Sequence, residues 1–514
     1  MKKSQKILCL TLVFVLLTAA LSGCGDKKTS DNGKVTLKWM NNVAIDSDSE
    51  VEKFLEERYN VEIDTISVTS NYTDKLGAML ASNEVPDVFM VNEPDMWIPL
   101  AKQGLIASID MDMVKEYAPD YYKSIVDFDE NLFKICQVNK KTYALSKVTG
   151  DEYNTSAIWR KDWLDKVGIT KTPETIEEFE EAFTKMRNDD PDGNGKKDTY
   201  GMSAMGNHLQ RFFDVIFGAY GVMPGQWSVD KNGKVSCDAL SDKAKEALIT
   251  LNRWYEKELI HPEFITDDVS TLSSKFDNGV VAVKFAGATG ATGFTSAGKS
   301  FRDGWAKRNP NASFEIGTIP IGPDGDRGDW LWGNRSNFVC FGKQLEDNPE
   351  AMQAALRILN DTICNDEVAL KVYYGDKGVT YDITDNGADY IGDYAADAAK
   401  RAEYGVGTFF NMLKPLATWA VPEVANKYMS SKLVTFMEEN AKWGGIKDDL
   451  YRPVLDSSSI YQADLDKIRL VAYSEFITGA RSFDKWDEFV DEYMDKGGKV
   501  LLEEAQEYYD TVLK

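Results

Sequence analysis

Histidine is nearly absent from this 514-residue chain, in which His208 and His261 are the two copies. Neither has a partner at zinc-ligand spacing, so no zinc site is expected. The sequence also lacks a G-x-S-x-G elbow and any cysteine–histidine pair with a plausible orienting residue. Its 83 acidic residues include no pair in a recognisable glycosidase context. The sequence therefore predicts a protein that is not an enzyme.

A second long hydrophobic run is also missing. The one apolar run, from Ile7 to Ala20, follows a start with three lysines and is shorter than the roughly 20 residues that span a bilayer. These features predict a signal peptide at residues 1–23, and the remainder is expected to be soluble. About 490 residues then exceed the size at which one hydrophobic core stops growing, so two lobes are expected.

Small residues lead directly to Cys24, in the sequence Leu-Ser-Gly-Cys. This pattern resembles a bacterial lipobox, in which the cysteine is lipidated and becomes the mature N-terminus. The alternative is an ordinary secretory signal with an incidental cysteine. The polar stretch that follows favours a lipid-anchored tether over residues 24–34, held by acyl chains on the outer face of the cell membrane.

The chain has no excess of basic residues, and its net charge is −24. Nucleic acid and anionic membrane surfaces would repel such a protein, so neither is an expected partner. We expect a monomer.

After Cys24, four cysteines remain without a CxxC pair, and sequence alone leaves their pairing open. They are Cys136, Cys237, Cys340 and Cys364.

Strand and helix patterns alternate at the start of the predicted mature chain. This order predicts an α/β lobe with a mainly parallel sheet, in which ligands lie beyond the carboxyl ends of the strands. Asn41, Asn42, Asn92 and Glu93 stand at those ends. The predicted strands are 35–40, 61–68 and 86–91, and the predicted helices are 51–59 and 72–81.

Helical patterns become frequent beyond Gly150. Thr175 and Glu178 form a capping box that predicts a helix through Met186, and residues 239–259 predict another. From residue 350 the chain is nearly all helical in pattern. Further strands are expected within 276–285, 314–320 and 337–341.

Two features imitate known sites. Gly293 to Ser300 satisfies the phosphate-loop pattern G-x-x-x-x-G-K-[ST], but residues 286–292 separate it from the preceding strand, which argues against nucleotide binding. Several tryptophans near predicted loops could stack on a sugar ring, although core packing is the commoner role of each one. These tryptophans are Trp305, Trp330, Trp332, Trp419 and Trp443.

An acidic, glycine-bent loop follows the helix through Met186. Oxygen-bearing side chains at alternating positions are what a hard cation such as Ca²⁺ requires. They belong to Asp190, Asp192, Asn194 and Asp198.

Several segments together resemble one protein family over essentially the whole predicted mature chain. They include PDVFMVNEPD, IWRKDWLDKVGI, DPDGNGKKDTYG and FDNGVVAVKF. The chain resembles the extracellular solute-binding lipoproteins of carbohydrate ABC importers, in the branch of the LplA-type and alginate-oligosaccharide-binding proteins.

The resemblance implies a two-lobe, periplasmic-binding-protein-like fold of type II, with a hinge and a helix-rich C-terminal part. It places residues 35–150 and 285–336 in the N-terminal lobe, and residues 151–284 and 337–514 in the C-terminal lobe. The lobes would close on an oligosaccharide and deliver it to the permease subunits.

The resemblance also implies a structural Ca²⁺ in the acidic loop, with the Lys196 carbonyl completing the ligand set. Gly201 and Thr199 depart from the pattern, and an acidic turn without metal is the alternative. A carbohydrate hydrolase and a binding protein for a peptide remain rival functions. The expected ligand contacts are Asn41, Asn42, Asp46, Asn92, Glu93, Tyr153, Trp332, Asn334, Arg335 and Trp419, with Arg160 either facing an acidic sugar or paired with Asp162.

Overall fold

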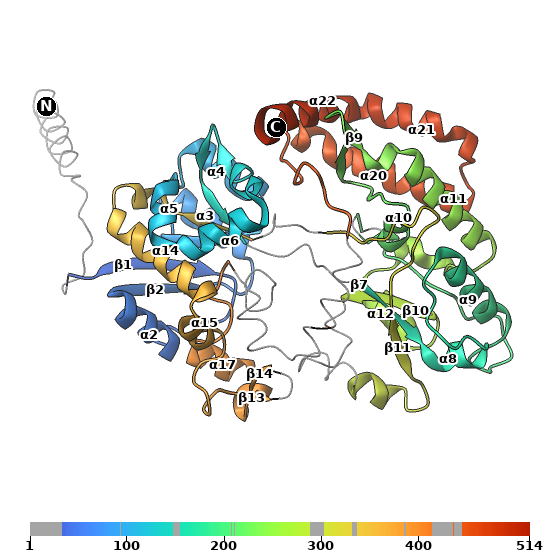
Figure 1. The fold of residues 1–514 in the computed structure, drawn as a ribbon, viewed down its shortest axis with the longest axis horizontal. Coiled ribbons are helices and arrows are strands. Elements are labelled where there is room, and N and C mark those ends of the chain that lie inside the picture. The colour runs from blue at the N-terminus through green and yellow to red at the C-terminus, as the bar shows by residue number, and fades with distance from the viewer. Residues whose placement is uncertain are drawn as a thin grey trace, which may run out of the picture.

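The chain forms two lobes, which lie side by side in Figure 1. The first contains the described residues of 33–147 and 337–413, and the second those of 155–331 and 445–514. In this computed structural model the described residues are 33–92, 94–147, 155–206, 208–209, 211–287, 303–331, 337–384, 387–413, 435 and 445–514.

The first lobe is built on a five-stranded sheet in the order β2-β1-β3-β12-β6. β1 pairs in parallel with β2 and β3, whereas β12 is antiparallel to β3 and β6. The predicted α/β order is confirmed, and the sheet is mixed. The strands of this lobe are β1 (Val35–Asn41), β2 (Val61–Ser67), β3 (Val88–Val91), β4 (Gln137–Val138), β5 (Lys141–Thr142), β6 (Ala144–Ser146), β12 (Phe338–Phe341), β13 (Tyr381–Thr384) and β14 (Gly387–Tyr390).

Helices cover both faces of this sheet because its central strands are buried on both sides. Trp39 of β1 packs edge-on against Phe410, and Trp97 of α4 packs against Phe338. The helices are α2 (Glu50–Tyr59), α3 (Tyr72–Ala81), α4 (Pro94–Gln103), α5 (Met111–Tyr117), α6 (Pro119–Asp129), α7 (Asn131–Lys134), η4 (Lys343–Glu346), α14 (Pro349–Cys364), α15 (Asp366–Tyr373), α16 (Asp393–Ala396) and α17 (Ala398–Tyr404).

The second lobe contains a three-stranded antiparallel sheet in the order β10-β7-β11. The predicted capping box is confirmed at α9, where Thr175 and Glu178 bond each other's backbone N–H groups. Trp159 of β7 then packs against Phe179 and Phe183 of that helix. The strands are β7 (Thr155–Arg160), β8 (Trp227–Val229), β9 (Val235–Cys237), β10 (Val283–Gly287) and β11 (Phe314–Gly317).

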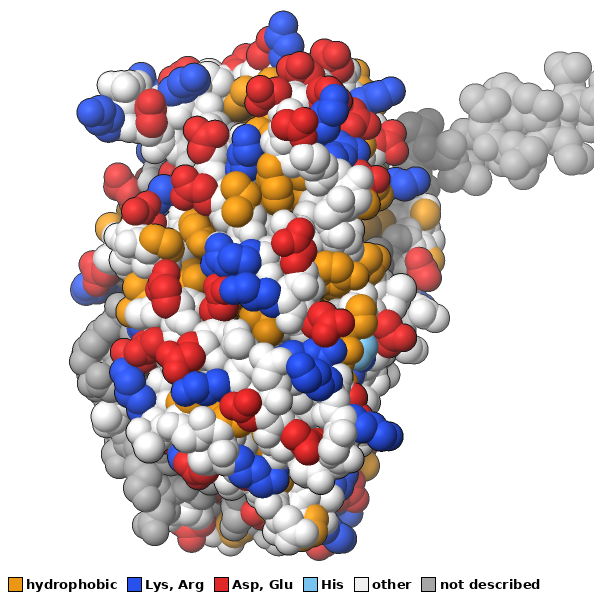
Figure 2. Space-filling view, turned by 90° about the vertical axis from the view of Figure 1, so that its right-hand side faces the viewer, with side chains coloured by type: hydrophobic (Ala, Val, Ile, Leu, Met, Phe, Trp, Pro, Cys, Tyr) orange, Lys and Arg blue, Asp and Glu red, His pale blue; other side chains and the backbone are white. Residues whose placement is uncertain are grey.

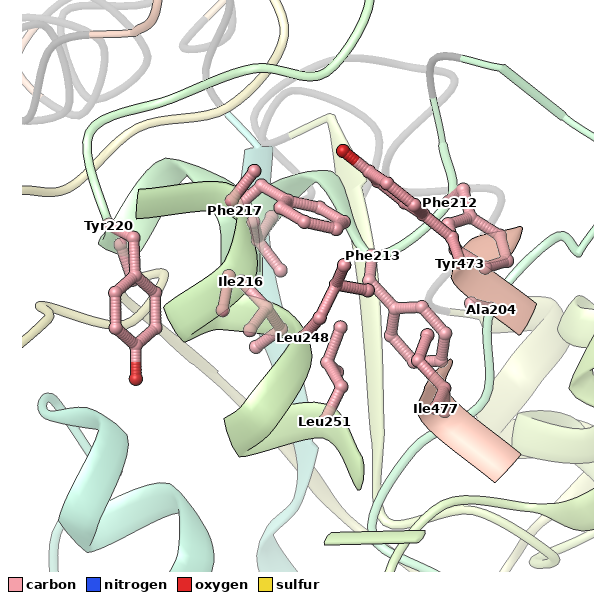
Figure 3. Packing of buried hydrophobic residues seen from close by; sticks show 14 of the residues in the cluster. Ala204, Phe212, Phe213, Ile216, Phe217, Tyr220, Leu248, Leu251, Tyr473 and Ile477 are labelled. Atoms are coloured by element: carbon pink, nitrogen blue, oxygen red, sulfur yellow. The ribbon is translucent and has the colours of Figure 1, made fainter. Parts of the chain in front are cut away.

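The largest core of this lobe joins α10 and α11 to the C-terminal helix α20. Phe217 stacks on Tyr473 at 5.5 Å between ring centroids, and Phe213 lies close to Ile477 and Leu251 (Figure 3). The helices are α8 (Lys161–Lys166), α9 (Ile176–Asn188), α10 (Asp214–Ala219), η1 (Asp238–Leu240), α11 (Asp242–Glu256), η2 (Pro262–Thr266), α12 (Val269–Asp277), α20 (Ser458–Thr478), η5 (Phe483–Lys485), α21 (Trp486–Tyr493), η6 (Met494–Gly498), α22 (Lys499–Tyr508) and η7 (Tyr509–Leu513).

The strand pairing corrects the expected assignment of segments to lobes. β10 and β11, expected in the N-terminal lobe from Phe285 onwards, pair with β7 of the second lobe. β12, expected in the C-terminal lobe, pairs with β3 of the first. The expected assignment is wrong for these strands because a short apolar strand does not encode which distant strand it will join.

The structure also shows the state of the cysteines and the distribution of charge on the surface. The four cysteines left open by the sequence are free thiols, and Cys136 and Cys340 are buried. Acidic and basic side chains are interspersed on the side of the second lobe that faces away from the first (Figure 2). Among the described residues, no helix has the length and hydrophobicity that a membrane span needs.

Candidate functional site

One edge of the first sheet faces the second lobe (Figure 1). β1, β2 and β3 end at this edge because they run in parallel, and β12 begins there. The described chain also changes lobe three times, between Lys147 and Thr155, between Leu331 and Asn337, and between Leu413 and Gly445. The facing surfaces of the two lobes are therefore the candidate ligand site.

Asn41 has a structural role at this edge. Its side-chain amide donates to the carbonyl oxygens of Thr408 and Phe409 at 3.3 and 2.8 Å, and its Oδ1 accepts the Asn42 N–H at 2.7 Å. The side chain is 1% exposed. Its hydrogen bonds hold β1 to the segment before Leu413 and leave little capacity for a ligand.

Other predicted contacts are more accessible. Asn42, Asp46 and Asn92 are exposed near the same edge, and the Asp46 N–H donates to the Ala402 carbonyl at 3.0 Å. Their role toward a ligand stays a prediction. The remaining expected contacts lie outside the described residues, and they are Glu93, Tyr153, Trp332, Asn334, Arg335 and Trp419.

The guanidinium of Arg160 is paired with a carboxylate of its own lobe and is not a free cation. Its guanidinium donates to both carboxylate oxygens of Asp162, at 2.9 and 2.7 Å, and lies 4.6 Å from the centroid of the Trp163 ring. Trp305 and Trp330 are 1% and 5% exposed, so core packing accounts for them. Trp443 lies outside the described residues.

The second lobe contributes a hollow of about 40 Å³ where β7 begins. Arg211, Asp214 and Lys284 line it together with mostly apolar side chains from five stretches of the chain. Ligand pockets usually enclose about 300–1,000 Å³, so this hollow has room for a few water molecules or one ligand group. It is suited to form part of the wall of a larger site.

Asp214 lines this hollow and Asp329 bonds the backbone of its lining residue Thr155, and sequence reasoning missed both carboxyl groups. Burial raises the pKa of Asp214 to about 6, although Arg211 acts in the opposite direction. Burial raises the pKa of Asp329 to about 7, and the negative charge of Asp214 adds to this effect. The Asp329 carboxylate also accepts the Thr155 N–H at 3.2 Å. Asp214 and Asp329 are 115 residues apart in the sequence, so no short motif contains both.

The acidic loop is folded around its own oxygens. Asp190 accepts backbone N–H groups of Gly193, Asn194 and Gly195 at 2.8–3.1 Å, and these bonds, led by that of Gly195, lower its pKa. Burial and the neighbouring Asp190 raise the pKa of Asp192. Gly193 and Gly195 have φ of 76° and 78°, which side chains rarely tolerate.

The donor set of this loop suits a hard cation in composition. The Asn194 amide nitrogen donates to Asp192 at 2.7 Å and to Asp198 at 3.1 Å, so an N–H group occupies the place between two carboxylates. Turning that amide would offer its oxygen to the same place. The described residues nevertheless contain no preformed cluster of three acidic, histidine or cysteine ligands.

Gly201 and Thr199 explain why the loop departs from an EF-hand. A Cβ on Gly201 would lie 2.2 Å from Cγ of Phe183, so no glutamate fits there. Thr199 is 1% exposed and its hydroxyl donates to the Met186 carbonyl at 2.7 Å. Both residues serve packing beneath the loop.

Comparison with known proteins identifies the family. The profile described as bacterial extracellular solute-binding protein matches residues 46–339, more than half of the chain. The chain belongs to this family. It is accordingly an extracellular solute-binding protein and not an enzyme.

Curated relatives of this solute-binding protein align over nearly their full length. Lipoprotein LipO of Bacillus subtilis is 26% identical, with 96% of this chain and 97% of the relative covered. The polygalacturonan/rhamnogalacturonan-binding protein YtcQ of Bacillus subtilis is 23% identical, with 99% of both covered. The fructooligosaccharide ABC transporter substrate-binding protein FusA of Streptococcus pneumoniae is 24% identical, with coverages of 96% and 97%.

Solved structures confirm the fold class. FusA of S. pneumoniae in complex with kestose superposes with a TM-score of 0.64 at 19% identity, covering 92% of this chain and 99% of FusA. An extracellular solute-binding protein of Bifidobacterium longum subsp. infantis gives 0.70 at 16% identity, covering 95% and 100%. The alginate-binding protein AlgQ2, solved without calcium ion, gives 0.61 at 17% identity, covering 93% and 98%.

Proposed function

We propose that this protein is the substrate-binding component of an ABC importer and captures an oligosaccharide between its lobes. The observation that carries the proposal is the alignment with FusA and YtcQ over nearly the whole chain, because both are named for oligo- or polysaccharide binding. The two-lobe architecture supports it, since closure around a ligand gives the permease a distinct shape to recognise. The permease subunits would then be its protein partners.

Contacts from both lobes would recognise the sugar. Asn42, Asp46 and Asn92 would come from the first lobe, and Arg211, Asp214 and Lys284 would line the opposite wall. Carboxylate, amide and cationic groups select hydroxyl or acidic substituents, and aromatic rings stack on the sugar face. The remaining proposed contacts are Glu93, Tyr153, Trp332, Asn334, Arg335 and Trp419.

A thermal-shift screen tests the ligand class. The panel contains kestose, rhamnogalacturonan fragments and alginate oligosaccharides, with short peptides as the competing class. A ligand at 100 times its Kd stabilises the folded protein by about 2.7 kcal/mol, which is easily detected. Stabilisation by peptides and by none of the sugars would reject the oligosaccharide proposal.

We further propose that the acidic loop binds Ca²⁺ through Asp190, Asp192, Asn194 and Asp198, with the Lys196 carbonyl. The support is the chemistry of the donors, since three carboxylates and an amide lie on one turn, where the Asn194 amide bonds both Asp192 and Asp198. The ion would stabilise the loop after α9. Isothermal titration of the chelator-treated protein with CaCl₂ tests this binding.

The location proposed for the protein is the outer face of the cell membrane, with Cys24 lipidated and residues 24–34 as a tether. The support is the lipobox-like sequence and the similarity to a lipoprotein. Mass spectrometry of the membrane fraction tests it, because a Cys24→Ala variant would lose the acyl groups. Release of wild-type protein without acyl groups would refute the anchor.

A further inference from the structure

The second-lobe residues that flank the three changes of lobe, Thr155, Leu331 and Ile446, meet at Asp329. The Asp329 carboxylate accepts the N–H of Thr155, which follows the first change of lobe. Its carbonyl accepts the N–H of Ile446 at 2.9 Å, and Ile446 follows the third change of lobe. Leu331 precedes the second change of lobe and donates to the Ile446 carbonyl at 3.3 Å. Hydrogen bonds therefore join the second-lobe ends of the three connections.

A tight turn, residues 446–452, continues from this point and is fixed to the second lobe. Asp448 and Asp449 accept backbone N–H groups of β8 at 3.2 and 2.7 Å. Tyr451 and Arg452 have φ of 57° and 52°, a region that non-glycine residues adopt in succession only when their surroundings enforce it. The turn is therefore held in a costly backbone conformation that presents Tyr451 outward from the second lobe.

Tyr451 reaches the first lobe. Its hydroxyl donates to the carboxylate of Asp129, at the end of α6, and accepts from the Asn131 amide at 3.4 Å. Lys447 forms an ion pair with the same Asp129 oxygen at 3.3 Å. The Tyr451 ring packs against the first-lobe core, and the Asp129 side chain is 13% exposed. This is a partly buried polar contact between the lobes.

We propose that Asp129 and Tyr451 are positioning residues that form the pivot on which the two lobes turn during ligand capture. The contact follows directly on Ile446, which bonds Asp329 and Leu331 where the chain changes lobe, and points near a rotation axis move least when two bodies rotate. A contact there persists during closure, whereas a contact at the far rim would break. The inference rests on the proposed capture between lobes.

Removing the contact loosens the relative orientation of the lobes, while the contacts of Lys134 with the Leu513 carbonyl and of Lys102 with Asp456 remain. In X-ray scattering of the purified protein without ligand, Asp129→Ala shifts the interlobe part of the pair-distance distribution to longer distances and broadens it. Tyr451→Phe, which keeps the ring, produces the same change with smaller amplitude. The double variant is no broader than Asp129→Ala, because the bond between Tyr451 and Asp129 is already lost in that variant.

The matched control is Tyr59→Phe. Tyr59 donates to Asp361 at 2.7 Å within the first lobe, so its loss removes a similar bond without touching the pivot. Its distance distribution should equal that of the wild type. Unchanged distributions in both Tyr451→Phe and Asp129→Ala, or equal broadening in Tyr59→Phe, would overturn the proposal. If Asp129→Ala fails to fold, Tyr451→Phe decides.

The scattering experiment needs no sugar. Failure of the oligosaccharide proposal would appear in the thermal-shift screen and leave the distance distributions unaffected. Failure of the pivot would leave the screen unaffected. The two outcomes are therefore distinguishable.

Discussion

The acidic loop and the carboxyl pair Asp214 and Asp329 place the same functional group in opposite surroundings. In the loop, backbone N–H groups stabilise the charged form of Asp190 and lower its pKa. At the lobe wall, burial raises the pKa of Asp214 and Asp329 to about 6 and about 7. Carboxylates of the first kind suit a cation, whereas those of the second kind change charge near neutral pH.

The largest expected effect comes from placing a glutamate at Gly201, the position at which an EF-hand loop carries its last ligand. Gly201→Glu forces side-chain atoms into Phe183, so we expect a loss of about 3 kcal/mol in the free energy of unfolding. Urea unfolding measures it. Lys197→Gln also changes the net charge by −1, at an exposed loop position, and its effect should stay within about 0.5 kcal/mol. A stable Gly201→Glu protein with tighter Ca²⁺ binding would show that packing is not the reason for the glycine.

Calcium removal is expected to have the next largest effect. At 100 times its Kd, Ca²⁺ adds about 2.7 kcal/mol to the free energy of unfolding, and EDTA removes this gain. Differential scanning calorimetry measures the change in Tm. Asp190→Ala should abolish the response to EDTA. Ligand affinity at a temperature where the protein stays folded should hardly change, and a large loss would place the loop at the ligand site.

Asp329→Asn tests the buried carboxyl group. The pKa of Asp329 is raised in the folded state, so its contribution to the free energy of unfolding falls as pH rises from about 4 to about 7. Asparagine does not titrate. Relative to wild type, the variant should therefore gain about 1–3 kcal/mol between pH 5 and pH 8 in urea unfolding. Asp324→Asn, on the same segment but exposed, should show no such gain, and a parallel pH profile for Asp329→Asn would contradict the raised pKa.

The smallest effect is expected at Glu180 of α9. Burial alone would raise its pKa, but hydrogen bonds from Arg253, Lys257 and Trp254 outweigh it and lower the pKa to about 2. Its stabilisation is complete above the unfolded pKa and is lost as pH falls from about 4.5 to 2. Glu180→Gln should cost less than about 1 kcal/mol at pH 7, with the difference vanishing near pH 2. If the destabilisation caused by Glu180→Gln grew as the pH was lowered, the pKa of Glu180 would be raised in the folded state and not lowered.

Local features of the fold were readable from sequence. The capping box of α9, the helix at Tyr72–Ala81 and the strands of the first lobe follow from short-range patterns, and the structure confirms them. The partners of β10, β11 and β12 were not readable, because pairing depends on residues more than 100 positions apart. The sequence correctly placed Asn41 at a strand end. It gave no sign of the hydrogen bonds from the Asn41 side-chain amide to the carbonyl oxygens of Thr408 and Phe409.

By itself the sequence determined the family, the acidic loop and the alternation of elements, because each is written in neighbouring residues. Tertiary structure alone decided which strands share a sheet and which carboxyl groups are buried. It also brought Asp129 to Tyr451 and Asp329 to Thr155 and Ile446. Such contacts depend on chain segments that meet only after folding, and their burial sets the pKa of groups that look ordinary in the sequence.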